Sequence, residues 1–255
     1  MVTVLRRLTG LGGILLAGAG LLLWTAHVTD FLHGGLVKDP ERATPAGPVI
    51  VAPADGTVLY VRRVEAGAIA EVVKKGVRVA LTDYLKRPLT TPDFRGWLIG
   101  IFMKTHGVHI NRIPLAGEVR RITVHNGPHL SMKQAEKHLL YAEMIPGLIA
   151  LRKWLGHPPF DISDEEEFVL KSARETLEIR DERDRQLFVI RIADYYVGRI
   201  LTWVEEGRQV ASGERFGMIT WGSQTDLLIE ESPGLQVTVQ SGDRVLGGES
   251  VLASF

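Results

Sequence analysis

A short element occurs twice in the last third of the chain. Glu206–Glu214 (EGRQVASGE) recurs as Ser241–Glu249 (SGDRVLGGE), with matched residues 35 positions apart, as in Gly207 and Gly242. Each copy predicts a turn, a buried valine on a short strand and a second turn, because glycine tolerates the backbone conformations of tight reversals. Two such elements favour a core of short antiparallel strands.

The first half of the chain also has strand character. Pro48–Arg62 predicts two strands around a Pro-Ala-Asp-Gly turn, and β-branched and aromatic residues indicate further strands. These further strands are Glu71–Thr82, Trp97–Met103 and Gly117–His125. The segment between them and the repeats has helical character, with pieces at Met132–Met144 and Leu148–Leu155 and a helix start at Ser163–Glu166. We therefore predict an α+β chain that is predominantly antiparallel β. The repeated hairpins resemble those of lipoyl-like domains, which implies a lipoyl-like β-sandwich or barrel core with added helices.

The N-terminus predicts a membrane segment. Leu8–Trp24 contains no charged residue and follows Arg6 and Arg7. Its length is at the lower end of what spans a bilayer, and it lacks the cleavage site of a signal peptide. We expect residues 1–37 to be a retained anchor and linker, and residues 38–255 to be the catalytic domain. The protein would then be located at the cell membrane, anchored by a segment that spans the bilayer or peripheral through one that lies in its interface.

Composition excludes several classes of partner and site. The chain has 30 basic and 30 acidic residues, and this balance argues against nucleic acid as a partner. It contains no cysteine, so disulfides and cysteine-containing metal sites are excluded.

The Gly222-Ser223 pair can undergo backbone chemistry. Because glycine has no side chain to block the approach, the Ser223 hydroxyl can attack the carbonyl carbon of Gly222 and convert the peptide bond into an ester. Removal of the serine α-proton would eliminate the ester, and hydrolysis of the resulting dehydroalanine would leave a pyruvoyl group. On its own, the dipeptide is better explained as a strand end followed by an ordinary turn serine.

The surrounding residues decide between these interpretations. Phe216–Asp226 (FGMITWGSQTD) resembles the self-cleavage region of pyruvoyl-dependent phosphatidylserine decarboxylases. The other blocks of that family follow in order, so the resemblance extends from about Lys38 to the C-terminus. These blocks are Lys38–Arg42 (KDPER), Val51–Gly56 (VAPADG), Phe102–Pro114 (FMKTHGVHINRIP), Ile192-Ala193 and Gly198–Ile200.

The resemblance implies a proenzyme that cuts itself between Gly222 and Ser223. A large chain, 1–222, and a small chain, 223–255, would stay bound together, and the cofactor would be a pyruvoyl group derived from Ser223. Asp55 would orient His109, which would deprotonate Ser223, and His106 would donate a proton during decarboxylation.

The implied reaction belongs to phospholipid biosynthesis. The pyruvoyl group would form a Schiff base with phosphatidylserine, or a related serine phospholipid, and release carbon dioxide and phosphatidylethanolamine. No metal is expected. Gln224 departs from the residues that many family members have after the serine, and it would lie beside the pyruvoyl group.

Two other functions account for part of the pattern. A membrane-anchored lipoyl-like adaptor without catalysis would explain the repeat and the hydrophobic segment. A zinc peptidase would use His106, His109 and Asp55 as ligands. Asp55-Gly56 is also a strong turn signal, so Asp55 could serve the turn alone.

Overall fold

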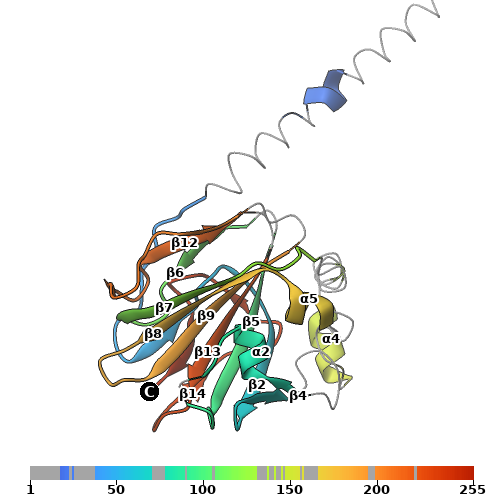
Figure 1. The fold of residues 1–255 in the computed structure, drawn as a ribbon. Helices are drawn as coiled ribbons and strands as arrows, with labels where there is room; N and C mark the ends of the chain where they lie inside the picture. The colour runs from blue at the N-terminus through green and yellow to red at the C-terminus, as the bar shows by residue number, and fades with distance from the viewer. Residues whose placement is uncertain are drawn as a thin grey trace, which may run out of the picture.

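Antiparallel sheets make up most of the computed structural model (Figure 1). The structure describes residues 18–22, 25, 38–70, 78–89, 91–104, 107–130, 137, 141, 145, 147–155, 157, 166–194, 199–220 and 223–255. The central sheet contains β2 (Gly56–Glu65), β3 (Ala68–Ala70), β4 (Arg78–Ala80), β5 (Gly96–Met103), β7 (Gly117–His125), β8 (Arg174–Arg180), β9 (Gln186–Ala193), β11 (Gln209–Val210), β13 (Ser223–Glu230) and β15 (Arg244–Val245). Its order is β11-β7-β8-β9-β13-β5-β2-β3-β4, and β15 pairs with β2. The predicted α+β class with predominantly antiparallel strands is therefore confirmed.

Two small sheets cover one side of the central sheet. One has the order β1-β16-β14, formed by Val49–Val51, Val251–Ser254 and Gln236–Val237. The other has the order β10-β12-β6, formed by Ile200–Thr202, Arg215–Ile219 and Ile110–Arg112. Their apolar side chains pack with those of the central strands in one buried cluster, as Phe216 does with Ile101 and Leu227.

Helices cover the other side of the central sheet. They are α2 (Leu81–Leu85), α4 (Leu148–Trp154) and α5 (Glu166–Lys171). Tyr84 of α2 and Phe168 of α5 join a second buried cluster with Leu98 and Phe102 of β5. Strand β5 therefore contributes to both clusters, as expected for a strand that is buried on both faces.

The two copies of the repeat have the same local structure. Val210 lies in β11 and Val245 in β15, and both side chains are buried. The matched glycines of both copies have positive φ, between 77° and 95° (Gly207, Gly213, Gly242 and Gly248). Only glycine adopts this conformation readily, so the predicted turns are confirmed.

One predicted strand is partly wrong. In the segment expected to be a strand over Glu71–Thr82, β4 covers only Arg78–Ala80, and α2 starts at Leu81; residues 71–77 lie outside the described part of the chain. The buried residues of α2 are Leu81, Tyr84 and Leu85, whose spacing places them on one helical face. Lys86 then ends the helix in a left-handed conformation with φ of 57°.

The N-terminal hydrophobic segment remains a prediction. Of residues 1–37, only 18–22 and Thr25 are described, and they are helical. Within the described residues, we find no helix with the length and hydropathy needed to cross a bilayer.

Candidate active site

Ser223 is the first residue of β13, in the middle of the central sheet. It is level with Met103 of β5 on one side and with Ala193 of β9 on the other. Its side chain is fully buried, and its hydroxyl lies 3.4 Å from the Met103 sulfur. The neighbouring sheet strands thus hold this serine in one orientation, while Gly222 and Trp221 lie outside the described residues.

His109 directly precedes β6 and contacts the strand that leads to Ser223. Its carbonyl oxygen accepts a hydrogen bond of 3.2 Å from the N–H of Ile219, the last residue of β12. The side chain is fully buried, and burial lowers the pKa of His109 to about 4. The imidazole is therefore uncharged at neutral pH, which is the state that can accept a proton.

Asp55 lies in the turn between β1 and β2. Two backbone hydrogen bonds, each of 2.9 Å, align the segment before Asp55 with β6: Val51 N–H to the Pro114 carbonyl, and Arg112 N–H to the Pro53 carbonyl. The fold therefore brings together the three chain segments that carry Asp55, His109 and the approach to Ser223.

Two groups bind the carboxylate of Asp55. Its Oδ2 lies 2.6 Å from Nη2 of Arg42, and its Oδ1 accepts a hydrogen bond of 2.8 Å from Gly247 N–H. Its hydrogen bonds within the described part of the chain do not include one to His109. The pairing of Asp55 with His109 stays a prediction.

The repeat distinguishes the two interpretations of Asp55. Val245 pairs with Gly56 at the start of β2, and Val210 pairs in the same way with Gly117 at the start of β7. The residue before Gly56 is Asp55, whereas the residue before Gly117 is Ala116. The equivalent turn thus forms without a carboxylate, so the fold does not require an acid at this position. This argues for a functional role of Asp55.

A cavity of about 190 Å³ lies beside Asp55. Lys104 and Arg244 both line it, and Lys104 directly follows the residue that pairs with Ser223. Burial, and then the nearby charge of Arg244, lower the pKa of Lys104. The cavity thus combines two cationic side chains with Asp55 at the end of β5 where Ser223 lies, which suits an anionic ligand. Its lining residues are Asp55, Gly56, Thr57, Lys104, Gly107, Val108, Arg244, Val245 and Leu246.

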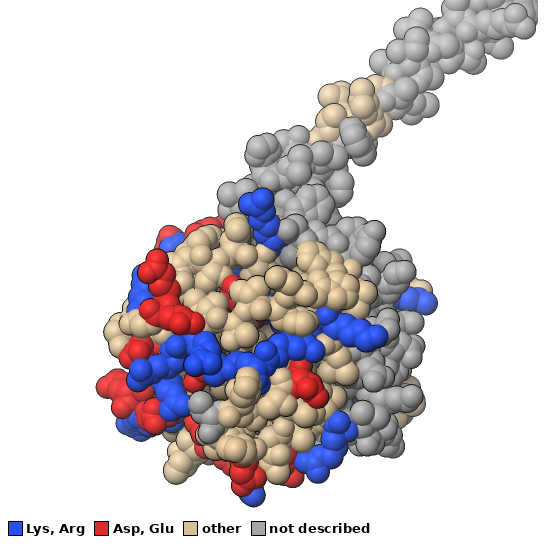
Figure 2. Space-filling model, viewed as in Figure 1, with Lys and Arg blue, Asp and Glu red and all other residues tan. Residues whose placement is uncertain are grey.

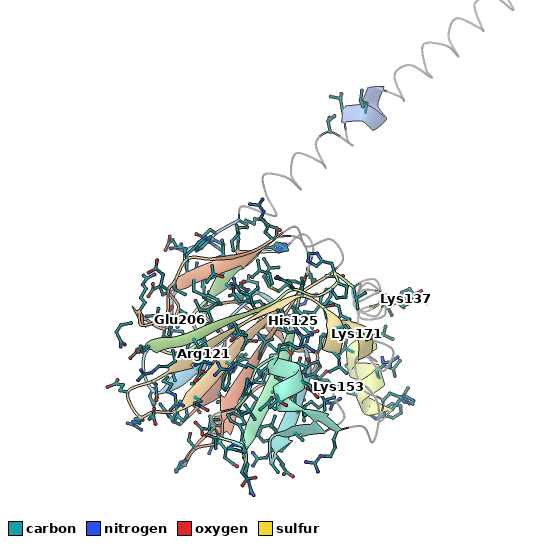
Figure 3. The ribbon with its side chains drawn as sticks, in the orientation of Figure 1. Arg121, His125, Lys137, Lys153, Lys171 and Glu206 are labelled. Carbon is teal, nitrogen blue, oxygen red and sulfur yellow. The ribbon has the colours of Figure 1, made fainter. Side chains whose placement is uncertain are left out.

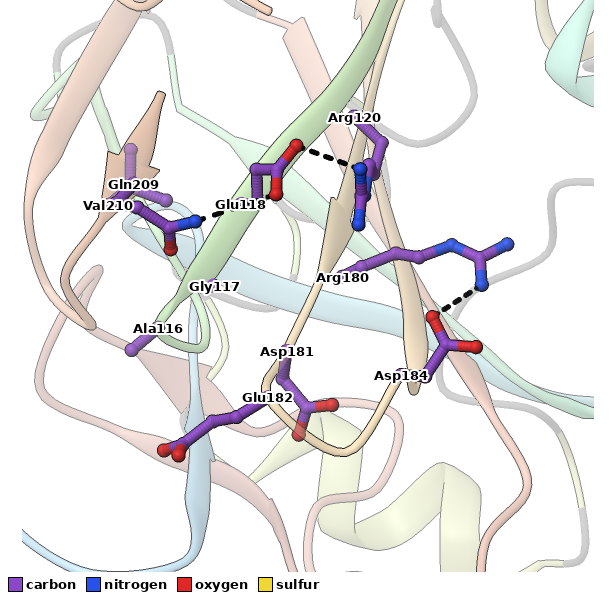
Figure 4. A pocket seen from close by; sticks show the side chains of 10 residues that line it. All are labelled: Ala116, Gly117, Glu118, Arg120, Arg180, Asp181, Glu182, Asp184, Gln209 and Val210. Atoms are coloured by element: carbon purple, nitrogen blue, oxygen red, sulfur yellow. Dashed lines mark hydrogen bonds and ion pairs between the residues drawn. The ribbon is translucent and has the colours of Figure 1, made fainter. Parts of the chain in front are cut away.

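A larger cavity of about 570 Å³ occupies the equivalent position at the other turn (Figure 4). It lies next to Ala116, and two ion pairs join side chains that line it: Glu118 with Arg120 at 2.9 Å, and Arg180 with Asp184 at 2.7 Å. It contains none of the predicted catalytic residues. We therefore place the candidate site at the smaller cavity.

A family model described as phosphatidylserine decarboxylase matches residues 35–253 of this chain. The chain belongs to the phosphatidylserine decarboxylase family. The resemblance seen in the sequence blocks is thereby confirmed. Membership favours a decarboxylase over the adaptor and the zinc peptidase, the two alternatives that the sequence left open.

Individual relatives cover most of the chain. A phosphatidylserine decarboxylase proenzyme of Gluconobacter oxydans is 31% identical over 242 residues, which are 94% of this chain and 82% of the relative. A putative archaetidylserine decarboxylase proenzyme of Methanothermobacter thermautotrophicus is 30% identical over 240 residues, covering 92% of this chain and 85% of the relative. A phosphatidylserine decarboxylase proenzyme of Chlorobaculum tepidum is 28% identical over 244 residues, covering 94% and 83%. The similarity therefore includes the segments of Asp55, His109 and Ser223.

The remaining predicted residues are not placed. His106 and Gly222 lie outside the described residues. The residues that the structure does describe contain no group of three His, Asp or Glu side chains that could hold a metal ion. Since His106 is not among them, this observation does not bear on a ligand set that includes it.

On the opposite face of β13 lies a buried polar network that the sequence did not predict. Gln224 Nε2 donates hydrogen bonds of 2.6 Å to Asp226 Oδ1 and to the Tyr60 oxygen. Tyr60 and Tyr84 both donate to Asp226 Oδ2, and all four side chains are buried. Burial raises the pKa of Asp226 to about 6.

The network explains how this family member accommodates Gln224. Its carboxamide does not extend toward Ser223 but points to the other face, because side chains alternate along a strand. A signal for this network was present in the sequence. Gln224 and Asp226 are polar residues two apart in a strand that continues with Leu227, Leu228 and Ile229. Tyr60 and Tyr84 come from distant segments and carried no such signal.

Proposed function

We propose that this protein is a phosphatidylserine decarboxylase proenzyme that cleaves itself between Gly222 and Ser223. Family membership supports the activity. The single structural observation that carries the proposal is the position of Ser223: it is buried at the start of a central strand, and the β12 segment leading to it is bonded to an uncharged histidine, His109. A neutral imidazole that reaches the buried serine would activate its hydroxyl for nucleophilic attack.

The chain's own residues would perform self-cleavage in three steps. His109 takes the Ser223 hydroxyl proton while the oxygen attacks the Gly222 carbonyl carbon, and the C–N bond breaks as the amine leaves, giving an ester. A base then removes the α-proton of residue 223, so the C–O bond breaks and Gly222 leaves as a carboxylate. Water finally hydrolyses the dehydroalanine, releasing ammonia and leaving the pyruvoyl group on the N–H of Gln224.

The site fits this outcome. Because β13 pairs along its length with β5 and β9, both in the large chain, the end of the small chain would stay in place after the cut. Strands β15 and β16 of the small chain also pair with β2 and β1 of the large chain. The pyruvoyl group would supply an electron sink for loss of carbon dioxide. His106 would hold the proton that replaces the carboxyl group.

The cavity beside Asp55 would receive the head group. Lys104 and Arg244 place positive charge there, and a serine phospholipid carries a phosphate and a carboxylate. The substrate would be phosphatidylserine or a related serine phospholipid. One relative is named a putative archaetidylserine decarboxylase proenzyme, so archaetidylserine is a second lipid to be tested.

A membrane surface would be the second partner. Besides the predicted anchor, apolar side chains in and before α4 are between 43% and 81% exposed (Tyr141, Ile145, Leu151, Trp154 and Leu155). Figure 2 shows Lys and Arg side chains gathered in a band across one face of the molecule. On the same face, Figure 3 labels Arg121, Lys153 and Lys171. Exposed apolar side chains near cations suit the surface of an anionic bilayer.

Intact mass spectrometry of the full-length protein beside a Ser223→Ala variant tests the proposal. We expect two fragments separated between Gly222 and Ser223, the smaller one ending in a carbonyl instead of an amine, and an uncut variant. Incubation with phosphatidylserine should then release carbon dioxide from the wild type only. A folded, membrane-bound wild type that stays whole would overturn the proposal.

A further inference from the structure

Residues 38–44, here called the N-terminal strap, are bound to the catalytic domain by ion pairs. The Asp39 carboxylate lies 3.0 Å from Nη2 of Arg112 and 2.6 Å from Nε of Arg215. Glu41 pairs with the same Arg215 at 2.9 Å. At the end of the strap, Thr44 is packed so closely against Gly213 that a Cβ on the glycine would lie 1.9 Å from the threonine hydroxyl. The strap therefore occupies a defined position over β6 and β12.

From this strap, Arg42 reaches the predicted self-cleavage site. Its Nη2 contacts Asp55 Oδ2 at 2.6 Å, and its Nη1 contacts Glu249 Oε2 at 3.4 Å. The Arg42 side chain is only 9% exposed and that of Asp55 15%. A charge-assisted hydrogen bond in such a shielded place is stronger and better oriented than one at the surface.

The other bond to Asp55 comes from the future small chain. Gly247 N–H binds the second carboxylate oxygen, and both Gly247 and Glu249 belong to residues 223–255. Arg42 and Asp55 belong to the large chain. These contacts join the strap, the turn of Asp55 and the second copy of the repeat into one cluster at the site.

The charges around Asp55 give Arg42 a specific electrostatic role. Burial raises the pKa of Asp55, while the Gly247 N–H, Arg42 and the charge of Arg112 lower it. Lys104 and Arg244 line the cavity beside Asp55, and Glu249 pairs with Arg42. Arg42 is the cation in direct contact, so it opposes the effect of burial most directly.

We propose that Arg42 is a positioning residue for self-cleavage, which holds the Asp55 carboxylate ionised and oriented for His109. This inference rests on the proposed function, because it assigns Asp55 to self-cleavage. The ion pair is not needed to form the turn, since the equivalent turn before Gly117 forms around Ala116. The strap that carries Arg42 follows the predicted membrane segment, so the same contact would connect that segment to the site.

The experiment follows self-cleavage of the newly made full-length chain. The protein is synthesised in a cell-free system with vesicles, and the conversion of the precursor into its two fragments is measured over roughly pH 4 to 9. The variants are Arg42→Gln, Arg42→Lys and, as a matched control, Arg215→Gln. Arg215 binds the same strap through Asp39 and Glu41 but does not contact Asp55.

We expect Arg42→Gln to slow self-cleavage by about tenfold or more near pH 6. The acid limb of the pH profile should also move to higher pH, because loss of the cation raises the pKa of Asp55 further. Arg42→Lys should keep the acid limb near that of the wild type, with a lower rate from poorer geometry. Arg215→Gln should cleave like the wild type. The same substitutions in a Ser223→Ala chain, which cannot cut itself, report whether each variant is folded.

Several outcomes would overturn the inference. Arg42→Gln could cleave at the wild-type rate and with the same pH profile, or it could be slower at every pH with an unmoved acid limb, which would indicate a structural role alone. If Arg42→Gln does not fold, Arg42→Lys decides, because wild-type kinetics in that variant contradict a role for the guanidinium geometry. A wild-type chain that remains uncut would instead contradict the proposed function.

Discussion

Tyr60 donates a hydrogen bond of 2.7 Å to Asp226 across an intervening strand. Both residues are level with Gly100 of β5, Tyr60 on the β2 side and Asp226 on the β13 side. A Cβ on Gly100 would lie 2.4 Å from the Tyr60 ring, so the missing side chain leaves the space that the ring occupies. The strand that begins with Ser223 is thus tied to β2 through side chains as well as through the sheet.

Gly100→Ala should lower the free energy of unfolding by about 2 to 3 kcal/mol, because the added methyl group collides with a buried ring. Urea unfolding of a Ser223→Ala chain, which stays in one piece, measures the change. Combining Gly100→Ala with Tyr60→Leu removes the collision. The decrease in the free energy of unfolding of the double variant should therefore be smaller, by at least about 1 kcal/mol, than the sum of the decreases in the two single variants. Strictly additive losses would contradict the packing described.

Asp226→Asn should remove one component of the pH dependence of stability. The pKa of Asp226 is about 6 in the folded protein against 3.8 for an ordinary aspartate. Stabilisation by the protonated carboxyl is present below the unfolded-state pKa and is lost as pH rises through the folded-state pKa. The free energy of unfolding of the wild type should therefore fall by on the order of 2 to 3 kcal/mol between about pH 4 and pH 7, relative to that of Asp226→Asn.

Urea unfolding at a series of pH values, again in the Ser223→Ala chain, measures this difference. Asp93→Asn is the matched control, because the Asp93 side chain is 70% exposed. The control should follow the wild type at every pH. A constant difference between wild type and Asp226→Asn over this range would mean that Asp226 is ionised in the folded protein throughout.

Arg244→Gln should weaken binding of the serine phospholipid. Loss of one of the two cations in the cavity should raise KM about tenfold and change kcat less, because the contact is made with the bound head group in both the ground and transition states. Arg208→Gln is the control, since Arg208 lies in the other copy of the repeat and pairs with Glu214. An unchanged KM for Arg244→Gln would exclude this cavity as the head-group site.

Leu155→Cys can report whether the region of α4 touches the membrane. The chain has no cysteine, so one introduced thiol can be labelled alone with an environment-sensitive fluorophore. With vesicles containing anionic phospholipid, emission should shift to the blue and be quenched by quenchers in the acyl region. Glu182→Cys, in the exposed turn between β8 and β9, should show neither change. A label at 155 that remains in water would place the α4 face away from the bilayer.

Much of the fold followed from local sequence signals. The β-branched and aromatic residues of Trp97–Met103 and Gly117–His125 predicted β5 and β7 with boundaries correct to within one residue. The glycines of the repeat predicted the turns around β11 and β15. The error at Leu81–Leu85 arose because a short apolar helix beside a strand carries too few residues for its period to be recognised. The lipoyl-like sandwich, the anchor at 1–37 and the division at residue 38 remain predictions.

The sequence by itself determined the family and its reactive pair, because the blocks around Asp55, His109 and Ser223 are short and local, and their chemistry depends on residue type. Only the tertiary structure decided what surrounds them. Arg42 meets Asp55, and Tyr60 and Tyr84 meet Asp226, through strands that are distant in sequence and adjacent in the sheets. Such contacts depend on strand order and register, and burial then sets the pKa values of His109 and Asp226. No local pattern of residues encodes these relationships.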